Sequence, residues 1–147
     1  MKKLGKTMTK KYEIILKYIQ DLSVEIPSPD IYLFSREYIT KYSLGINITT
    51  KPMKNEMIEI ITKLHYKDPN DNKRKSYFEI AYATVIKIKD KNLIKEELEK
   101  IILIEVQKEI YPELEKIFLT VIKDSGFPDL KLEKKVDFEQ LYNQKLN

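Results

Sequence analysis

The sequence predicts an α+β fold, with a four-stranded antiparallel sheet followed by C-terminal helices. In residues 13–88, apolar and polar side chains alternate along several segments, which is typical of strands with one buried face. In residues 114–122, apolar side chains instead recur three and four positions apart, which is typical of an amphipathic helix. Strands that are grouped in the sequence, and are not interleaved with helices, favour antiparallel pairing.

Four strands are expected, at residues 13–25, 41–49, 57–66 and 76–88. The second strand shows the alternation most clearly, and its apolar residues share one face: Tyr42, Leu44, Ile46 and Ile48. The fourth strand is apolar on both faces, so we expect other parts of the protein to pack against each of them. In a chain this short, a second subunit is a natural source of that packing.

The connections between the strands are marked by proline and by polar residues. Pro27 and Pro29 end the first strand, because proline cannot donate a hydrogen bond to a neighbouring strand. A loop is expected to follow, and it carries four apolar residues: Ile31, Tyr32, Leu33 and Phe34. Residues 67–75 are polar and predict a turn between the third and fourth strands.

Helices are expected in the last third of the chain. Residues 95–110 are rich in Glu, Lys, Leu and Ile and contain neither Gly nor Pro. Pro112 suits the first position of a second helix, which Gly126 ends. The apolar stripe of this helix consists of Leu114, Ile117, Phe118, Val121 and Ile122. Asp137 predicts the cap of a short final helix.

Composition argues against an enzyme. The chain has no Cys and a single histidine, His65, which excludes disulfides, cysteine nucleophiles and metal sites built from thiolates or several histidines. Only three Gly are present, and no glycine-rich phosphate loop is found. His65 is predicted to be a solvent-facing strand residue beside Lys63. We therefore expect no catalytic residue, no metal and no cofactor.

The positive charge is concentrated at the N-terminus. Residues 1–11 contain five Lys and no acid, so we expect a disordered basic tail before a single domain at residues 12–147. A lysine tail could contact a phosphate backbone without sequence specificity, which leaves a small nucleic-acid-binding protein as an alternative. Only Arg36 and Arg74 are arginines, however, and nucleic-acid readers depend on arginine. The chain has no apolar run long enough to span a membrane and no signal peptide, so we expect a cytoplasmic protein without membrane insertion.

Two patterns suggest binding surfaces. Asp21 and Glu25 lie four residues apart on one face of the first strand, about 13 Å from one another at the rise of a strand. They form either a line of negative charge for a basic partner or an ordinary solvated face. The ten Tyr and five Phe form either core packing or a surface for extended apolar polypeptide.

Two blocks of sequence resemble the SecB family of protein-export chaperones. Residues 18–27, Tyr-Ile-Gln-Asp-Leu-Ser-Val-Glu-Ile-Pro, are similar to the opening strand of that family. The second block begins at Tyr111-Pro112, continues at residues 127–130, Phe-Pro-Asp-Leu, and closes with Phe138 and Leu141-Tyr142. The resemblance covers residues 12–146 and implies a homotetramer, assembled as a dimer of dimers. It also implies a chaperone that works without nucleotide or metal, holds unfolded precursor proteins and delivers them to SecA.

The resemblance assigns roles to individual residues. It implies that SecA binds the acidic residues Asp21, Glu25 and Glu79. It implies that the fourth strand contributes to the tetramer through Phe78, Ile80 and Tyr82. Client contacts are expected from the predicted loop, the second strand and the helix stripe, at Tyr32, Leu33, Phe34, Leu44, Ile46, Leu114 and Phe118, although much of that stripe can also be read as core.

The chain departs from the family in three respects, one of which is that the acidic tail usual after the last helix is missing. Residues 12–147 carry a net charge close to zero, whereas the family is strongly acidic. The family's Gly-Gly pair in the fourth strand is replaced by Ala83-Thr84. The sequence leaves open whether the chain serves many secretory precursors or one aggregation-prone partner, such as an antitoxin.

Overall fold

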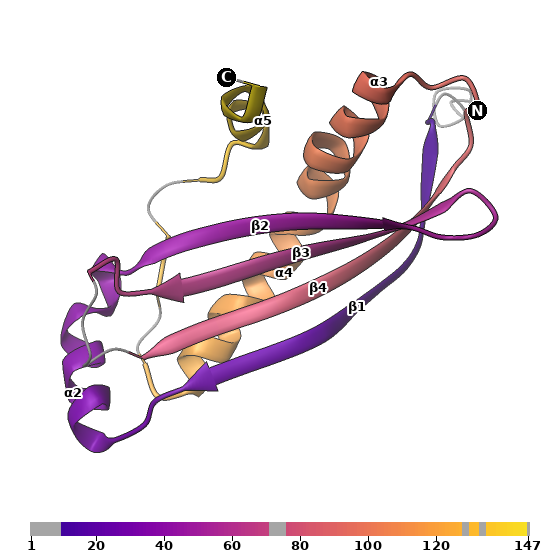
Figure 1. Cartoon of the computed structure of the whole chain (residues 1–147). Coiled ribbons are helices and arrows are strands. Elements are labelled where there is room, and N and C mark those ends of the chain that lie inside the picture. Colours follow the sequence, from indigo (N-terminus) through magenta and orange to yellow (C-terminus); the bar gives the residue numbers. More distant parts are fainter. Residues whose placement is uncertain (1–9, 71–75, 128–129, 133–134, 147) are drawn as a thin grey trace, which may run out of the picture.

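A computed structural model describes residues 10–70, 76–127, 130–132 and 135–146. The predicted basic tail, most of which is residues 1–9, and residues 71–75 of the predicted turn lie outside the described residues. Four strands form one antiparallel sheet: β1 (Tyr12–Glu25), β2 (Ser43–Pro52), β3 (Met57–Lys67) and β4 (Tyr77–Ile88). Their order across the sheet is β1-β4-β3-β2 (Figure 1). The α+β fold predicted from the sequence is confirmed.

Helices follow the sheet and cover one of its faces. The elements are α3 (Lys95–Lys100), the π-helical turn η2 (Ile101–Glu105), α4 (Val106–Asp124) and α5 (Phe138–Leu146). In Figure 1, α4 lies behind the strands. Its buried residues Ile110, Leu114 and Phe118 belong to the same core cluster as Ile60 and Ile80 of the sheet. We call the helix-covered side the inner face of the sheet and the opposite side the outer face.

The long helix continues through Pro112, so the predicted boundary at that residue is wrong. Pro112 lies inside α4 and is exposed to solvent. It leaves the carbonyl of Lys108 without an intrahelical donor, and Lys108 is also exposed, so water can satisfy that carbonyl. Upstream, Gln107 stabilises the π-helical turn: its Nε2 donates to the carbonyl of Ile102 at 3.2 Å, while its Oε1 accepts from Thr62 Oγ1 at 2.9 Å.

The predicted loop after β1 is instead a helix, α2 (Pro29–Tyr38), followed by a short 3-10 turn, η1 (Ile39–Lys41). Ser28 caps this helix, because its Oγ accepts a hydrogen bond from the backbone N–H of Ile31. Pro29 occupies the start of the helix, where its missing donor costs nothing. The prolines that end β1 therefore also begin α2.

Two bulges in β1 change which side chains share a face. The pairing with β4 shifts between Ile14 and Leu16 and again between Ile19 and Asp21. Each extra residue moves the following side chains to the other face. The simple alternation expected for this strand is therefore wrong: Leu16 and Tyr18 pair with outer-face residues of β4, whereas Leu22 and Val24 pair with inner-face residues.

Candidate functional site

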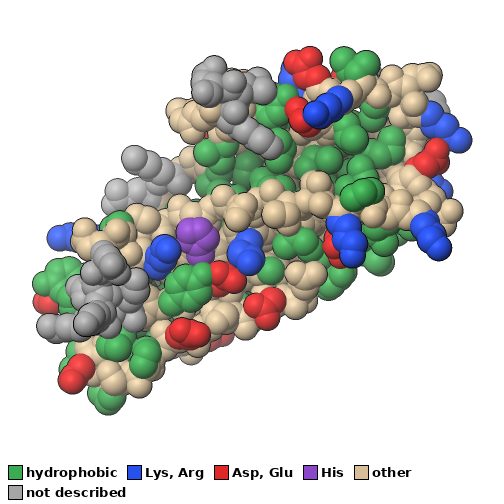
Figure 2. Space-filling model, viewed as in Figure 1, with side chains coloured by type: hydrophobic (Ala, Val, Ile, Leu, Met, Phe, Trp, Pro, Cys, Tyr) green, Lys and Arg blue, Asp and Glu red, His purple; other side chains and the backbone are tan. Residues whose placement is uncertain are grey.

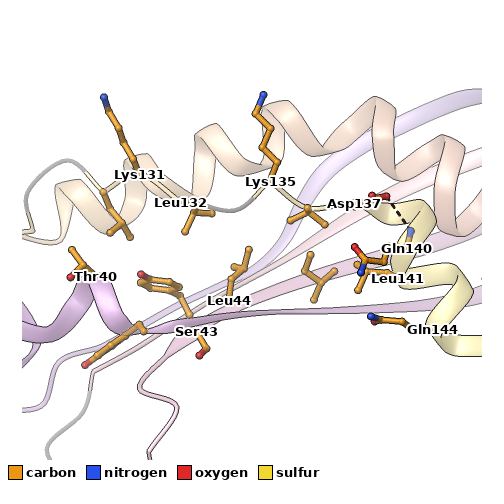
Figure 3. A pocket seen from close by; sticks show the side chains of 15 residues that line it. Thr40, Ser43, Leu44, Lys131, Leu132, Lys135, Asp137, Gln140, Leu141 and Gln144 are labelled. Atoms are coloured by element: carbon orange, nitrogen blue, oxygen red, sulfur yellow. Dashed lines mark hydrogen bonds between the residues drawn. The ribbon is translucent and has the colours of Figure 1, made fainter.

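An apolar groove runs beside β2, which is an edge strand. The groove has a volume of about 790 Å³ and lies between β2 and residues 130–132 and 135–144. Figure 3 shows Leu44 on one side, with Leu132 directed toward it from the other, whereas Lys131 and Lys135 point away. Most of the lining is apolar or aromatic: Tyr42, Leu44, Ile46, Tyr66, Leu130, Leu132, Val136 and Leu141. We call this hollow the β2 groove.

The β2 groove continues along the strand. A second hollow of about 300 Å³ shares Ile46 and Leu141 with the first and extends to Ile48, Leu103 and Tyr142. The two hollows therefore follow the chain from Tyr42, just before β2, to Ile48 within it, which is room for about seven extended residues at roughly 3.3 Å each. Within the described residues, β2 pairs with β3 along one edge, and no strand pairs with its other edge. Its unpaired backbone groups can bind an extended chain.

The C-terminal wall of the groove is held in place by α5. Asp137 caps this helix, since its Oδ1 accepts from the backbone N–H of Gln140 at 3.1 Å. The Phe138 ring packs edge-on against Tyr111 of α4, with ring centroids 5.4 Å apart. Burial raises the pKa of Tyr111, so its hydroxyl stays neutral in this apolar contact. Lys108 of α4 and Glu139 of α5 also form an exposed ion pair, with Nζ and Oε2 3.3 Å apart.

The structure separates the predicted client-binding residues into three groups. Leu44 and Ile46 line the β2 groove together. Leu114 and Phe118 are fully buried beneath the sheet, in agreement with the core interpretation of that stripe. Sequence reasoning missed the C-terminal wall at Leu130, Leu132, Val136 and Leu141. The first three lie outside the helices and strands, so no periodicity marks them, and Leu141 lies in the predicted final helix.

The third group, Tyr32, Leu33 and Phe34, lies on α2. Leu33 is 60% exposed, while Tyr32 stacks on Phe127 with ring centroids 5.2 Å apart. The Tyr32 hydroxyl donates to the carbonyl of Gly126. Leu33 and Phe34 line a separate hollow on α2, which shares no lining residue with the β2 groove.

The outer face brings the predicted acidic residues together. Ser23 lies opposite Glu79, and Asp21 and Glu25 flank Ser23 at alternate positions, so all three acids occupy one end of this face. Glu79 is also close to a cation: Lys63 Nζ lies 3.6 Å from its Oε2. The Tyr77 hydroxyl donates to Glu79, and burial together with this hydrogen bond raises the pKa of Tyr77 to about 12.

Basic groups lie beside these acids. His65 is directly opposite Glu79, with Lys63 and Lys67 two residues away on the same strand face. In Figure 2 the histidine lies between blue lysine side chains, with red acidic side chains in the row toward β1. His65 covers Gly45, because a Cβ at that glycine would come within 1.9 Å of the imidazole. His65 shares a strand face with Lys63, as predicted from the sequence. It does not face solvent fully, however, because its ring is half-buried against Gly45.

The predicted oligomer residues lie on the inner face. Phe78 and Ile80 have no exposed surface, and Tyr82 is 4% exposed, because the helices of the same chain cover them. Exposed apolar residues are instead concentrated on the edge strand β1: Ile15, Leu16, Tyr18, Ile19, Leu22 and Val24. Any role of Phe78, Ile80 and Tyr82 in assembly would therefore act through the shape of β4.

The described part of the chain shows neither a metal site nor a membrane-spanning helix. There, no cluster of three or more His, Cys, Asp or Glu side chains could hold a metal ion. None of the helices in these residues has the length and apolar character required to cross a membrane.

Comparisons with known proteins agree with one another. The family model described as preprotein translocase subunit SecB matches residues 5–147. A protein-export protein SecB from Pelagibacter ubique (strain HTCC1062) is 46% identical over 140 residues, which cover 95% of this chain and all of the relative. The protein-export protein SecB of Bartonella bacilliformis is 27% identical over 94 residues, or 64% of this chain and 58% of the relative.

A solved structure shares the fold. It is a SecB-like chaperone from Mycobacterium tuberculosis in complex with a peptide from an antitoxin. The match covers 92% of this chain and 99% of the other, with a TM-score of 0.67 and 11% sequence identity.

Proposed function

Because this chain belongs to the SecB family of protein-export chaperones, we propose that it is an ATP-independent chaperone that holds unfolded precursor proteins in the cytoplasm and delivers them to SecA. The observation that carries this proposal is the β2 groove. It is long, has apolar or aromatic residues at eight of its fifteen lining positions, and is bordered by the edge strand β2, which are features that an unfolded segment can use.

The chemistry of holding follows from the lining of the groove. An unfolded client exposes apolar side chains and unpaired backbone groups, and burial of apolar surface contributes roughly 25 cal/mol per Å². Apolar contacts do not depend on a particular sequence, so one groove can accept many segments. Binding removes unfolded chains from folding and aggregation by mass action, without nucleotide hydrolysis.

Assembly into a homotetramer is part of this proposal. The free edge of β1 exposes both backbone groups and apolar side chains, and a second copy that pairs along β1 would satisfy both. Several grooves in one particle would then bind several segments of one client, which raises the overall affinity through effective concentration.

Delivery is assigned to the outer face. We propose that Asp21, Glu25 and Glu79 bind a basic surface of SecA. The support is geometric, since the register of β1 and β4 brings these three carboxylates to one end of a face that helices do not cover in the described residues.

A second candidate function is a chaperone dedicated to one antitoxin. The solved relative that shares this fold holds an antitoxin peptide, and a groove along β2 could serve one partner as well as many. The two functions differ in selectivity, because a dedicated chaperone would bind one natural segment far more tightly than unrelated unfolded chains.

The test is the molar mass of the protein by chromatography with light scattering, with and without a reduced, unfolded secretory precursor. We expect a mass near four subunits, and a complex with the unfolded precursor but not with its folded form. Binding of only one co-purifying partner would favour the dedicated function. A monomer that ignores unfolded protein would contradict both.

A further inference from the structure

We propose that Lys63 is an internal counterion of Glu79, which a basic partner must displace, and that this exchange sets the selectivity of the outer face. The inference rests on the proposed function, because the partner considered is a basic surface of SecA. It concerns a residue, Lys63, that the resemblance did not single out.

The three carboxylates proposed to bind SecA, Asp21, Glu25 and Glu79, are not equivalent. Glu79 accepts a hydrogen bond from the Tyr77 hydroxyl and lies 3.6 Å from Lys63 Nζ, and its side chain is only 19% exposed. Asp21 and Glu25, in contrast, have no ion-pair partner among the residues that the structure describes, and both are exposed. A partner cation can therefore approach Asp21 and Glu25 directly, whereas at Glu79 it meets Lys63 first.

The ion pair between Lys63 and Glu79 is suited to exchange. The Lys63 side chain remains 43% exposed, and an ion pair of this kind contributes little to stability. A guanidinium can bind a carboxylate through two parallel hydrogen bonds, whereas an ammonium binds as a point charge. An arginine on the partner is therefore the group best able to replace Lys63 at Glu79.

A hollow in the outer face provides a place for the displaced ammonium. This hollow has a volume of about 360 Å³ and lies over Ala81, with Lys63 and Asp21 both in its lining. The polar side chains of Asn47 and Thr49 complete the side toward β2. Lys63 can thus exchange Glu79 for the polar side chains of Asn47 and Thr49, which leaves Asp21 open to the partner. Docking is then an exchange of ion pairs, and a partner with diffuse positive charge gains less than one with an arginine at Glu79.

The experiment measures the affinity of the cognate SecA for the intact chaperone by calorimetry, with Lys63→Gln, Glu79→Gln and the double variant. We expect Lys63→Gln to bind about two- to fivefold more tightly, because the internal competitor is lost. Glu79→Gln should bind more weakly. In the double variant, Lys63→Gln should add no gain, because the residue that it shields is gone.

Lys67→Gln is the matched control, since it removes the same charge from the same strand and face. An equal gain from Lys67→Gln would show that only net charge matters and would overturn the inference, as would a gain from Lys63→Gln that persists without Glu79. If the unmodified protein binds SecA and Lys63→Gln does not change the affinity, the inference fails while the proposed function stands. If no variant binds SecA, the delivery step of the proposed function fails, and the inference fails with it.

Discussion

The two edge strands of the sheet differ in what lies beside them. The edge of β2 faces a groove that the C-terminal segment of the same chain closes on its other side. The edge of β1 has no such wall within the described residues, and six of its apolar side chains are 37–54% exposed. An edge with a wall beside it leaves space for one extended chain, which suits a client that binds reversibly. A bare apolar edge suits a larger and more lasting partner, such as a second copy.

The largest effect should come from charges on β1. Tyr18 and Ile19 are 44% and 43% exposed near the middle of the fourteen-residue strand, on opposite faces. In antiparallel pairing with a second copy, middle residues lie close to their own equivalents, so Tyr18→Asp with Ile19→Asp places like charges together. We expect assembly to be lost, which light scattering would measure as a fall to the mass of a smaller species.

The matched control for this variant is Leu33→Asp on α2, where the replaced side chain is 60% exposed. It should leave the mass unchanged. If the Tyr18→Asp, Ile19→Asp protein keeps its assembly, the interface between subunits does not lie at β1. Loss of assembly in the Leu33→Asp protein would also contradict an interface at β1.

The difference between the edges was only partly accessible to sequence reasoning. The alternation of Leu44, Ile46 and Ile48 is local, and it correctly predicted the strand. Leu44 and Ile46 line the groove, and client binding by these two residues stays a prediction. The bulges of β1 were missed, because one inserted residue in a strand with apolar residues on both sides leaves a similar pattern. Ser28 did carry a local signal for α2, but the flanking prolines were interpreted only as the end of a strand.

The other wall of the groove could not be predicted in this way. Leu130, Leu132 and Val136 lie outside the helices and strands, so no periodicity marks them. Their position depends on α5 packing against α4 far from β2 in sequence, which is a tertiary property. The approach of Lys63 to Glu79 likewise depends on the register between β3 and β4.

The next largest effect should come from loosening the wall of the β2 groove. Phe138 is 3% exposed and packs on Tyr111, so Phe138→Ala removes the main apolar anchor of α5. Truncation of a buried Phe costs about 3–5 kcal/mol. We expect this loss in the local opening of α5, measured by hydrogen exchange, while the amides of β3 and β4 remain protected.

Leu141→Ala provides the comparison on the same helix, because Leu141 is 42% exposed and lines the groove instead of the core. Its effect on α5 exchange should be much smaller. If both variants raise hydrogen exchange in α5 equally, then Phe138 is not the anchor of this helix. The wall beside the edge of β2 would then be held in place by other contacts.

A smaller effect is expected within the groove itself. Leu44→Asp places a charge among apolar residues, and the charge must lose water when a client binds. We expect the affinity for an unfolded precursor to fall about tenfold, or about 1.4 kcal/mol, with assembly unchanged. Thr49→Asp on the same strand lies outside the groove lining and should retain the affinity. Equal losses in the two variants would exclude the groove as the client site.

The smallest effect tests whether the wall is positioned in advance. Asp137 accepts from the N–H of Gln140, and loss of such a cap costs about 1 kcal/mol. Asp137→Ala should therefore raise hydrogen exchange in the first turn of α5 and weaken client binding by less than the Leu44→Asp change does. Glu139→Ala removes an exposed carboxylate from the same turn, where its ion pair with Lys108 at 3.3 Å contributes little. If Asp137→Ala raises exchange and leaves client affinity unchanged, the wall closes only after the client has bound. If both properties change together, the cap holds a preformed groove, and the edge of β2 differs from that of β1 before any partner arrives.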